Sequence, residues 1–316
     1  MKFVIPAGTG QVGTMLARQL VADGHEVVVF SRNAVSLPWR SVRWDAETFG
    51  DWAEEIEGAD VVINLAGRNV NCRYNEKNRR EIMDSRVNST RVVSEAISRA
   101  SDPPRVWLQA STATIYSHRF DAANDEYTGV IGGSEPDAPA SWRFSIDVAR
   151  NWEKATEEAD TPNTRKVFLR SAITLSPDRG GIFDVLLGLV RRGVGGTAGS
   201  GRQYISWIHD LDFVRSVYWL IDHDELSGPV NLSAPEPLPN KEFMRVLRKA
   251  WGTSIGLPAS EWMLAMGAVF MRTETELALK SRRVVPTRLL ESGFEFEFPQ
   301  WEQAARDLCD RWRRAN

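Results

Sequence analysis

The feature that most constrains this chain is a glycine-rich turn between a short apolar segment and an amphipathic one. The turn is Ala7-Gly8-Thr9-Gly10-Gln11-Val12-Gly13, and the apolar run Phe3-Val4-Ile5 precedes it. After the turn, apolar residues recur at helical spacing as far as Val21, where Asp23-Gly24 ends the predicted helix. A second apolar run, Val27-Val28-Val29-Phe30, follows. This order predicts a strand–turn–helix–strand unit at the start of a parallel sheet.

The glycine turn predicts a site for the pyrophosphate of a dinucleotide. Glycines let the backbone turn sharply and approach a ligand, and the free N–H groups at a helix start attract an anion. A glycine-rich turn alone is often only a turn, so the prediction depends on the complete strand–turn–helix–strand context. The predicted cofactor contacts in this turn are Gly8, Thr9, Gly10, Gln11, Val12 and Gly13.

The residues after the second predicted strand indicate which dinucleotide would bind. They are Ser31-Arg32-Asn33, without the acidic residue that usually accepts from the ribose 2′-hydroxyl of NAD. A guanidinium can pair bidentately with a 2′-phosphate, and a hydrogen bond to a charged group contributes about 1.5–3 kcal/mol. The alternative is that Arg32 only solvates a strand end. We expect NADP(H), with Arg32 at the 2′-phosphate.

Composition argues against several classes of function. The 39 basic and 42 acidic residues are mixed along 316 residues, so we expect no nucleic-acid partner and no binding to a membrane surface. The longest apolar stretch, 262–271, is too short to span a bilayer. Cys72 and Cys309 form no metal-ligand spacing, so we expect no metal site. The unpaired cysteines and the absence of a secretory leader favour a cytoplasmic protein.

A second cofactor-binding turn is predicted after the buried strand that begins at Asp60. Its small residues would let the backbone lie against a cofactor, although tight packing of strand on helix is the alternative. The predicted contacts here are Asn64, Leu65, Ala66 and Gly67, joined by Ala110 at the end of a strand over 105–110. Other expected elements in this half are a strand over 42–45, a short helix through Trp52 and Ile56, and a long helix over 75–99.

Hydroxyl side chains cluster in Ala110-Ser111-Thr112-Ala113-Thr114-Ile115-Tyr116-Ser117, at the carboxyl end of that strand. Ligands of open α/β sheets bind at this edge, although most hydroxyls there could simply satisfy nearby backbone groups. A long loop over 118–141 follows, and a loop of that length is more often functional than a plain connector. A helix over 142–159 and a strand over 167–170 come next.

The second half predicts a smaller, mainly helical region beside a doubly wound sheet. We expect a Rossmann domain over 1–175, to which 203–233 returns, and a substrate region made of 176–202 and 234–316. The elements expected in this half are helices over 182–192, 240–251, 258–271 and 301–313, a glycine-rich segment over 193–201, a helix ending near Asp222, and a last strand over 230–232.

With these segments in place, the chain resembles an extended short-chain dehydrogenase/reductase. It is similar to the atypical epimerase-like branch, often labelled nucleoside-diphosphate-sugar epimerase or cell-division-inhibitor homologue. The resemblance covers nearly the whole chain. Its markers beyond the glycine turn are Asn64-Leu65-Ala66-Gly67, Asp84-Ser85-Arg86, Ser89-Thr90, Asn151-Trp152-Glu153, Gly195-Gly196, Ser206-Trp207-Ile208-His209, 231–235 and Gly293-Phe294-Glu295-Phe296.

The resemblance implies a Ser or Thr that orients the substrate, and Thr112 falls at this position. It also implies a Tyr four residues before a Lys, which exchange a proton and hold the nicotinamide ribose. Counted back from Trp152-Glu153, those places hold Ser145 and Ala149, and no Tyr-x-x-x-Lys occurs in the chain. The other candidates for the proton role are Tyr116, Asp147 and His209. The alternative role is packing beside the site for Tyr116, a solvated helix position for Asp147 and the ordering of a turn for His209.

By this resemblance, the expected function is an NADP(H)-dependent oxidoreductase or epimerase-like enzyme. Its small-molecule substrate would be polar, and could be linked to a nucleotide. It would sit between Thr112, the loop over 118–141 and the segment over 193–207. The absent Tyr and Lys keep open a non-catalytic NADP(H)-binding sensor or interaction protein. A homodimer through the helices over 75–99 and 142–159 is possible by analogy.

Overall fold

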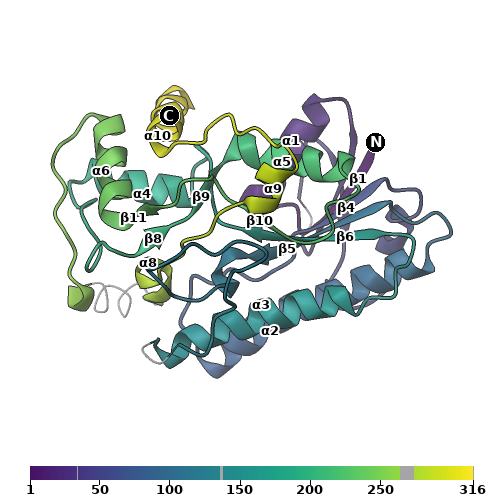
Figure 1. Ribbon diagram of the computed structural model, residues 1–316. Helices are drawn as coiled ribbons and strands as arrows, with labels where there is room; N and C mark the ends of the chain where they lie inside the picture. The colour runs from purple at the N-terminus through teal and green to yellow at the C-terminus, as the bar shows by residue number, and fades with distance from the viewer. Residues whose placement is uncertain (34, 136–137, 264–273, 316) are drawn as a thin grey trace.

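A seven-stranded parallel sheet organises the larger part of the molecule (Figure 1). The computed structural model describes residues 1–33, 35–135, 138–263 and 274–315. The strands lie in the order β10-β6-β5-β4-β1-β2-β3, so the predicted doubly wound sheet is confirmed. Their bounds are β1 (Lys2–Pro6), β2 (Glu26–Ser31), β3 (Arg40–Arg43), β4 (Val61–Asn64), β5 (Val106–Thr112), β6 (Arg165–Ser171) and β10 (Gly228–Leu232).

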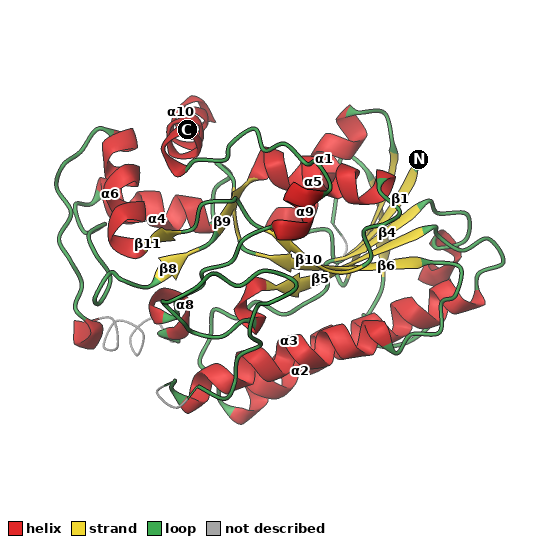
Figure 2. Cartoon of the chain, viewed as in Figure 1, coloured by secondary structure: helices red, strands yellow, loops and turns green. Residues whose placement is uncertain are grey.

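Helices cover both faces of this sheet (Figure 2). On one face lie α1 (Gln11–Ala22), α5 (Asp210–Asp222) and α9 (Thr287–Glu291); on the other lie α2 (Glu76–Arg99) and α3 (Ala140–Glu157). Each face of the sheet has its own hydrophobic core, and alternate residues of β1 point into one or the other. Phe3 and Ile5 pack with α1 and α5, whereas Val4 packs with α2. This division follows from the two-residue period of a strand. The order in which strands are added reverses between β1 and β4: β2 and β3 lie on one side of β1, and β4, β5 and β6 on the other. The carboxyl ends of β1 and β4 therefore open onto a crevice.

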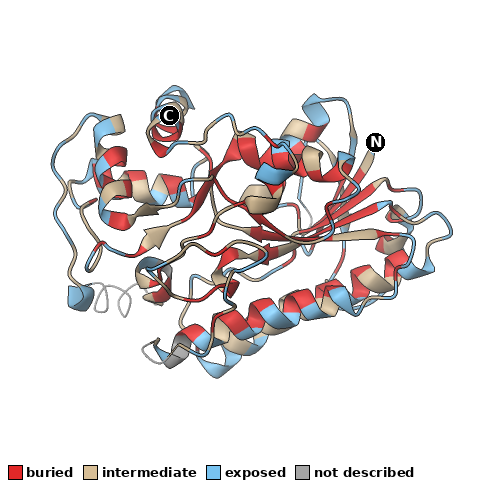
Figure 3. Cartoon of the chain, in the orientation of Figure 1, coloured by how far each residue is buried: buried red, intermediate tan, exposed pale blue. Residues whose placement is uncertain are grey.

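The smaller part has its own core, visible as buried residues at the left of Figure 3. Trp301 stacks on Phe243 with ring centroids 4.1 Å apart and lies beside Trp207. These rings fill the space between helices and two short sheets, β7–β9 and β8–β11. The elements are β7 (Ile173–Leu175), α4 (Ile182–Arg191), β8 (Tyr204–Ile205), β9 (Trp207–His209), β11 (Leu238–Pro239), α6 (Asn240–Trp251), α8 (Glu276–Leu279) and α10 (Trp301–Ala315).

Several sequence-based boundaries need correction. The third strand is Arg40–Arg43 rather than 42–45, because Asp45 accepts hydrogen bonds from the N–H groups of Glu47 and Thr48 in a turn. The predicted helix through Trp52 is a 3₁₀ turn, η1 (Asp51–Glu55). The fifth strand continues two residues further than predicted, to Thr112, and a 3₁₀ turn, η2 (Ala113–Ile115), follows it. Most of the helix predicted over 258–271 lies outside the described residues.

The segment over 203–233 divides between the two parts. The strand β10 pairs with β6 and α5 packs on the large sheet, whereas β8 and β9 belong to the short sheets. The smaller part is therefore less purely helical than the sequence suggested. Within the described ranges, no helix has the length and apolar character needed to cross a bilayer. In the same ranges, no group of three or more His, Cys, Asp or Glu side chains could hold a metal ion.

Candidate functional site

The glycines of the turn fall into two kinds: the packing of the protein leaves no room for a side chain at Gly8 and Gly13, but it does at Gly10. A Cβ on Gly13 would lie 2.4 Å from the Cα of Gly8, and one on Gly8 would lie 2.9 Å from Ile5. A Cβ on Gly10 would meet only the carbonyl oxygen of Ala7, at 4.0 Å. Gly10 is also the N-cap of α1 and supplies no side-chain cap. The space over Gly10 and the uncapped start of α1 together form a cradle that suits a pyrophosphate.

The side chain of Gln11 faces the smaller part of the molecule. Its Nε2 donates a 3.0 Å hydrogen bond to Ser176, and a Cβ on Gly181 would lie 2.2 Å from the same nitrogen. Arg18 on α1 and Asp178 form an ion pair at 3.2 Å. The loop between β7 and α4 is thus held beside the start of α1, and Gln11 keeps only its backbone for a cofactor.

Arg32 is exposed just after β2, the neighbour of β1 in the sheet. Among the described residues, no hydrogen-bond or ion-pair partner of its guanidinium is found. Next to it, the N–H of Asn33 donates to Ser31 at 3.3 Å. The guanidinium is therefore available to an anionic ligand at this end of the sheet.

The turn after β4 is shaped by a buried asparagine. The Asn64 carboxamide donates to Gln109 at 3.0 Å and accepts from the N–H of Ala66 at 3.1 Å. The N–H of Leu65 donates to Pro6 of β1, which holds the turn beside the glycine loop. Both the amide and the oxygen of the Asn64 side chain have partners within the protein, and we expect a ligand in the crevice to meet the backbone from 65 to 67.

A cavity of about 240 Å³ opens next to this turn, at the carboxyl end of β5. Apolar side chains form one part of its wall, and hydroxyls, two guanidiniums and one carboxylate form the rest. The lining residues are Val70, Tyr74, Ile82, Arg86, Ser111, Thr112, Thr114, Phe144, Ser145, Val148, Trp152, Glu276 and Arg282. The elements that contribute are β5, α2, α3, α8 and the loops on either side.

The positions that the sequence singled out for catalysis differ in whether they line this cavity. Thr112 lines it, with its Oγ1 accepting from the N–H of Thr114 at 3.1 Å, so the hydroxyl proton is free to point at a ligand. Ser145, at the place of the family tyrosine, also lines it. Ala149, at the place of the lysine, is completely buried in a small apolar cluster. Ala110 lies just before this edge in β5.

The other three proton candidates point elsewhere. The Tyr116 hydroxyl donates to Asn231 at 2.9 Å and accepts from Arg170, inside a buried network outside the cavity lining. His209 stacks on Phe298 and accepts from the N–H of Leu211, which orders the start of α5. Asp147 is exposed on α3.

Tyr74 is the phenol that reaches the cavity, and sequence reasoning missed it. It lines the cavity together with Ser145, and Ser145 donates to Glu276 at 2.6 Å. Burial, with the nearby Glu276 and Glu274 charges, raises the pKa of Tyr74, although hydrogen bonding with Ser145 opposes this. The phenol is therefore protonated at neutral pH. No spacing in the sequence could have revealed it, because Tyr74 and Ser145 come from different elements.

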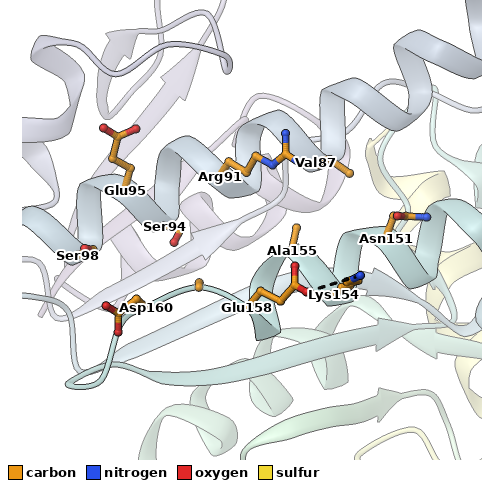
Figure 4. Close-up of a pocket in the computed structure, with 11 residues that line it drawn as sticks. Val87, Arg91, Ser94, Glu95, Ser98, Asn151, Lys154, Ala155, Glu158 and Asp160 are labelled. Carbon is orange, nitrogen blue, oxygen red and sulfur yellow. Dashed lines mark ion pairs between the residues drawn. The ribbon is translucent and has the colours of Figure 1, made fainter.

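A larger groove of about 400 Å³ lies away from this site, between α2 and α3 (Figure 4). Arg91 and Glu95 extend from α2, while Lys154 and Glu158 form an exposed ion pair at 3.6 Å on α3. Charges of both signs line this groove, and it has no contact with the glycine turn. Its chemistry is that of a solvated helix face.

Known proteins share both the sequence and the fold. Residues 7–233 match the NAD dependent epimerase/dehydratase family, and residues 259–308 match a domain of unknown function, DUF1731. The epimerase family protein YfhF of Bacillus subtilis is 29% identical over 98% of this chain and 98% of its own length. The human epimerase family protein SDR39U1 is 30% identical over 98% of this chain and 99% of its own length. Its crystal structure with NADPH has a TM-score of 0.85 and covers 98% of this chain and 99% of that chain, at 29% identity.

Proposed function

Because this chain belongs to the NAD dependent epimerase/dehydratase family, we propose that it binds NADP(H) and acts as an oxidoreductase or epimerase-like enzyme. The pyrophosphate would lie on the uncapped start of α1, over Gly10. Arg32 would pair with the 2′-phosphate, and the backbone of 65–67 would line the crevice. The NADPH in the crystal structure of human SDR39U1 supports this choice of cofactor.

The observation that carries the proposal is the open space over Gly10. Gly8 and Gly13 are explained by contacts within the protein, since a Cβ on either would collide with nearby atoms. Gly10 has φ −73° and ψ 172°, a conformation open to any residue, and a Cβ there would be nearly free of contacts. Glycine is accepted at a helix N-cap, and a ligand lying close to the backbone gives a further reason for a residue without a side chain here.

The reaction would take place in the cavity beside Thr112. The nicotinamide, when bound, supplies or accepts a hydride. The Thr112 hydroxyl would orient an oxygen of the substrate, and the protonated Tyr74 phenol would exchange a proton with it. Ser145 and Glu276 would hold the phenol and connect it to a carboxylate. Apolar neighbours such as Phe144, whose ring lies 5.1 Å from that of Tyr74, would exclude water.

Three measurements test the proposal. Calorimetry of the purified protein with NADPH should register saturable binding, and the loaded protein should then consume NADPH when offered a panel of small polar carbonyl compounds. An absence of heat at any practical NADPH concentration would refute the cofactor assignment. Binding without NADPH consumption across the panel would refute the oxidoreductase part; an epimerase restores its cofactor in each cycle, so that part would be refuted if NMR detected no new stereoisomer of any compound offered.

A second candidate is a non-catalytic NADP(H)-binding protein that senses redox state or recruits a partner. The observation that favours it is Ala149, a buried apolar residue where the family places a lysine that contacts the cofactor. This candidate predicts NADPH binding and no turnover, and a partner whose affinity changes between NADPH and NADP⁺. Pull-downs with each form of the cofactor separate it from the enzyme.

We also propose a homodimer through α2 and α3 and a cytoplasmic location. The first is supported only by analogy with the superfamily, and the mixed charges of the groove in Figure 4 offer ion pairs rather than an apolar seam. Light scattering after gel filtration, at low and high salt, tests the dimer. Cell fractionation tests the location.

A further inference from the structure

The cavity beside Thr112 contains more positive charge than its own residues neutralise. Arg86 and Arg282 both line it, and Glu276 is the one carboxylate in the described lining. Glu276 lies 3.6 Å from Lys280, whose side chain is completely buried behind it. Within the described lining, one carboxylate therefore stands against two guanidiniums, and that carboxylate also pairs with Lys280, on which Glu135 acts as well.

Arg86 is held in place without an acidic partner. Its Nη1 donates to the carbonyl of Ile82 at 3.0 Å, and its Cζ lies 4.9 Å from the centre of the Trp152 ring. Within the described part of the chain, no carboxylate oxygen comes within 4.0 Å of its nitrogens. Burial lowers the pKa of Arg86 to about 10, so the guanidinium is still charged at neutral pH. A Cβ on Gly67 would lie 3.0 Å from this guanidinium, which places the charge at the edge of the cofactor crevice.

Arg282 is fixed by neutral acceptors. Its Nε donates to Thr114 at 3.1 Å, and its Nη1 donates to the carbonyls of Glu276 and Lys280 at 3.3 Å. These bonds orient the guanidinium, and the carboxylate that acts on its charge, Glu276, is shared with Lys280. A partly buried cation whose counter-charge is absent or shared is costly, and such a cost is retained most readily where a ligand supplies the missing anion.

We propose that this cavity binds the carboxylate or phosphate group of a small anionic substrate, with Arg86 and Arg282 as the anion-binding residues. Planar guanidiniums match either group bidentately, and the apolar walls formed by Val70 and Val148 strengthen the attraction by lowering the local dielectric constant. Pockets for drug-sized ligands typically measure about 300–1,000 Å³. The 240 Å³ cavity therefore favours a compact acid over a bulky nucleotide-linked sugar. The inference rests on the proposed function, because it assigns the substrate class of the same site.

Fluorine NMR on the full-length protein saturated with NADPH tests the inference without requiring turnover. The probe is trifluoroacetate, and trifluoroacetamide of nearly equal size is the neutral control. The fluorine resonance of the anion should broaden and that of the amide should not. Arg86→Gln and Arg282→Gln should each weaken anion binding about ten-fold or more, since each removes a charged donor. Arg86→Lys should restore part of the binding. Arg91→Gln, on the same helix but facing the groove of Figure 4, is the matched control and should leave it unchanged.

The outcomes separate the inference from the proposed function. Saturating NADPH keeps the probe out of the cradle at α1. A variant that still releases heat when it binds NADPH in the calorimeter has folded. Displacement of the probe by acetate or by inorganic phosphate supports the inference and identifies the preferred anion. The inference would be overturned if both fluorine resonances broadened equally, if neither broadened, or if Arg86→Gln did not change the broadening of the anion resonance. Each of these results would leave NADPH binding intact. Absence of NADPH heat in the unaltered protein would instead refute the proposed function.

Discussion

Ser145 donates a hydrogen bond of 2.6 Å to Glu276, a residue 131 positions further along the chain. This bond joins α3, where the family carries its tyrosine, to α8 of the smaller part. The Tyr74 side chain lines the same cavity as Ser145, so a phenol from the loop before α2 reaches the place where a phenol is expected. The serine stands at the family position, whereas the phenol that we propose as the proton donor enters from another side.

Replacing Tyr74 with Phe tests this arrangement. Loss of a positioned proton donor should lower turnover about 10²–10⁴-fold, because general acid catalysis contributes that much. NADPH binding should not change, since Tyr74 lies outside the glycine turn. The control is Tyr127→Phe, which removes a hydroxyl bonded to Glu291 on the surface. Equal turnover for both variants would exclude Tyr74 from the reaction.

Replacing Arg32 with Asp tests the choice between NADP(H) and NAD(H). Each charge-assisted hydrogen bond that is lost should reduce NADPH affinity by about 1.5–3 kcal/mol, and the new carboxylate should repel the 2′-phosphate. NADH, which lacks that phosphate, should bind nearly as before or better. Calorimetry with both cofactors measures the two changes. Equal losses would show that Arg32 does not contact the 2′-phosphate.

Replacing Gly10 or Gly13 with Ala should separate binding from stability. A methyl group on Gly13 would lie 2.4 Å from Gly8, so Gly13→Ala should lower the free energy of unfolding by about 1–3 kcal/mol or more. The methyl group of Gly10→Ala is free of the protein, and because alanine is a poorer N-cap than glycine, stability should fall by no more than about 1 kcal/mol. The methyl group should nevertheless weaken NADPH binding by occupying the cradle. Urea unfolding and calorimetry on both variants give the comparison.

Local sequence patterns predicted the sheet well and the residues of the candidate cavity poorly. Apolar runs such as 27–30 and the glycine turn act within about 30 residues, so β1, α1 and β2 were recognisable from their own sequence. The cavity depends on contacts between distant segments, and neither Tyr74 nor Arg282 belongs to a motif with Thr112. Tyr116 was chosen because it is near Thr112 in sequence, yet its hydroxyl turns to Asn231.

The Glu153–Arg170 ion pair under the site should be important for stability. Arg170 donates two hydrogen bonds to the Glu153 carboxylate, and both side chains are about 10% exposed. Glu153→Gln would leave a buried guanidinium without its counter-charge and should destabilise the fold by about 3–5 kcal/mol. The neighbouring Lys154→Gln removes an exposed pair with Glu158 and should have an effect below about 0.5 kcal/mol. Urea unfolding of the two variants is the measurement, and similar midpoints would contradict the prediction.

Because Lys280 is buried, its deprotonation should make the protein more stable as the pH rises above about 8. Burial, joined by the Arg282 charge and opposed by Glu276 and Glu135, lowers the pKa of Lys280 from 10.5 to about 8. Between these values the unfolded chain binds more protons than the folded one, so the free energy of unfolding rises with pH. Below about pH 8 both states are protonated, and this dependence disappears.

The Lys280→Met variant isolates this contribution. The difference in unfolding free energy between the unaltered protein and the variant cancels other titrating groups. From about pH 7.5 to about pH 9.5 that difference should shift by about 2 kcal/mol in favour of the unaltered protein. Loss of the bond from Lys280 to the Thr114 carbonyl adds an offset that does not vary with pH. A difference that stays flat across this range would show that the buried lysine titrates near its ordinary pKa.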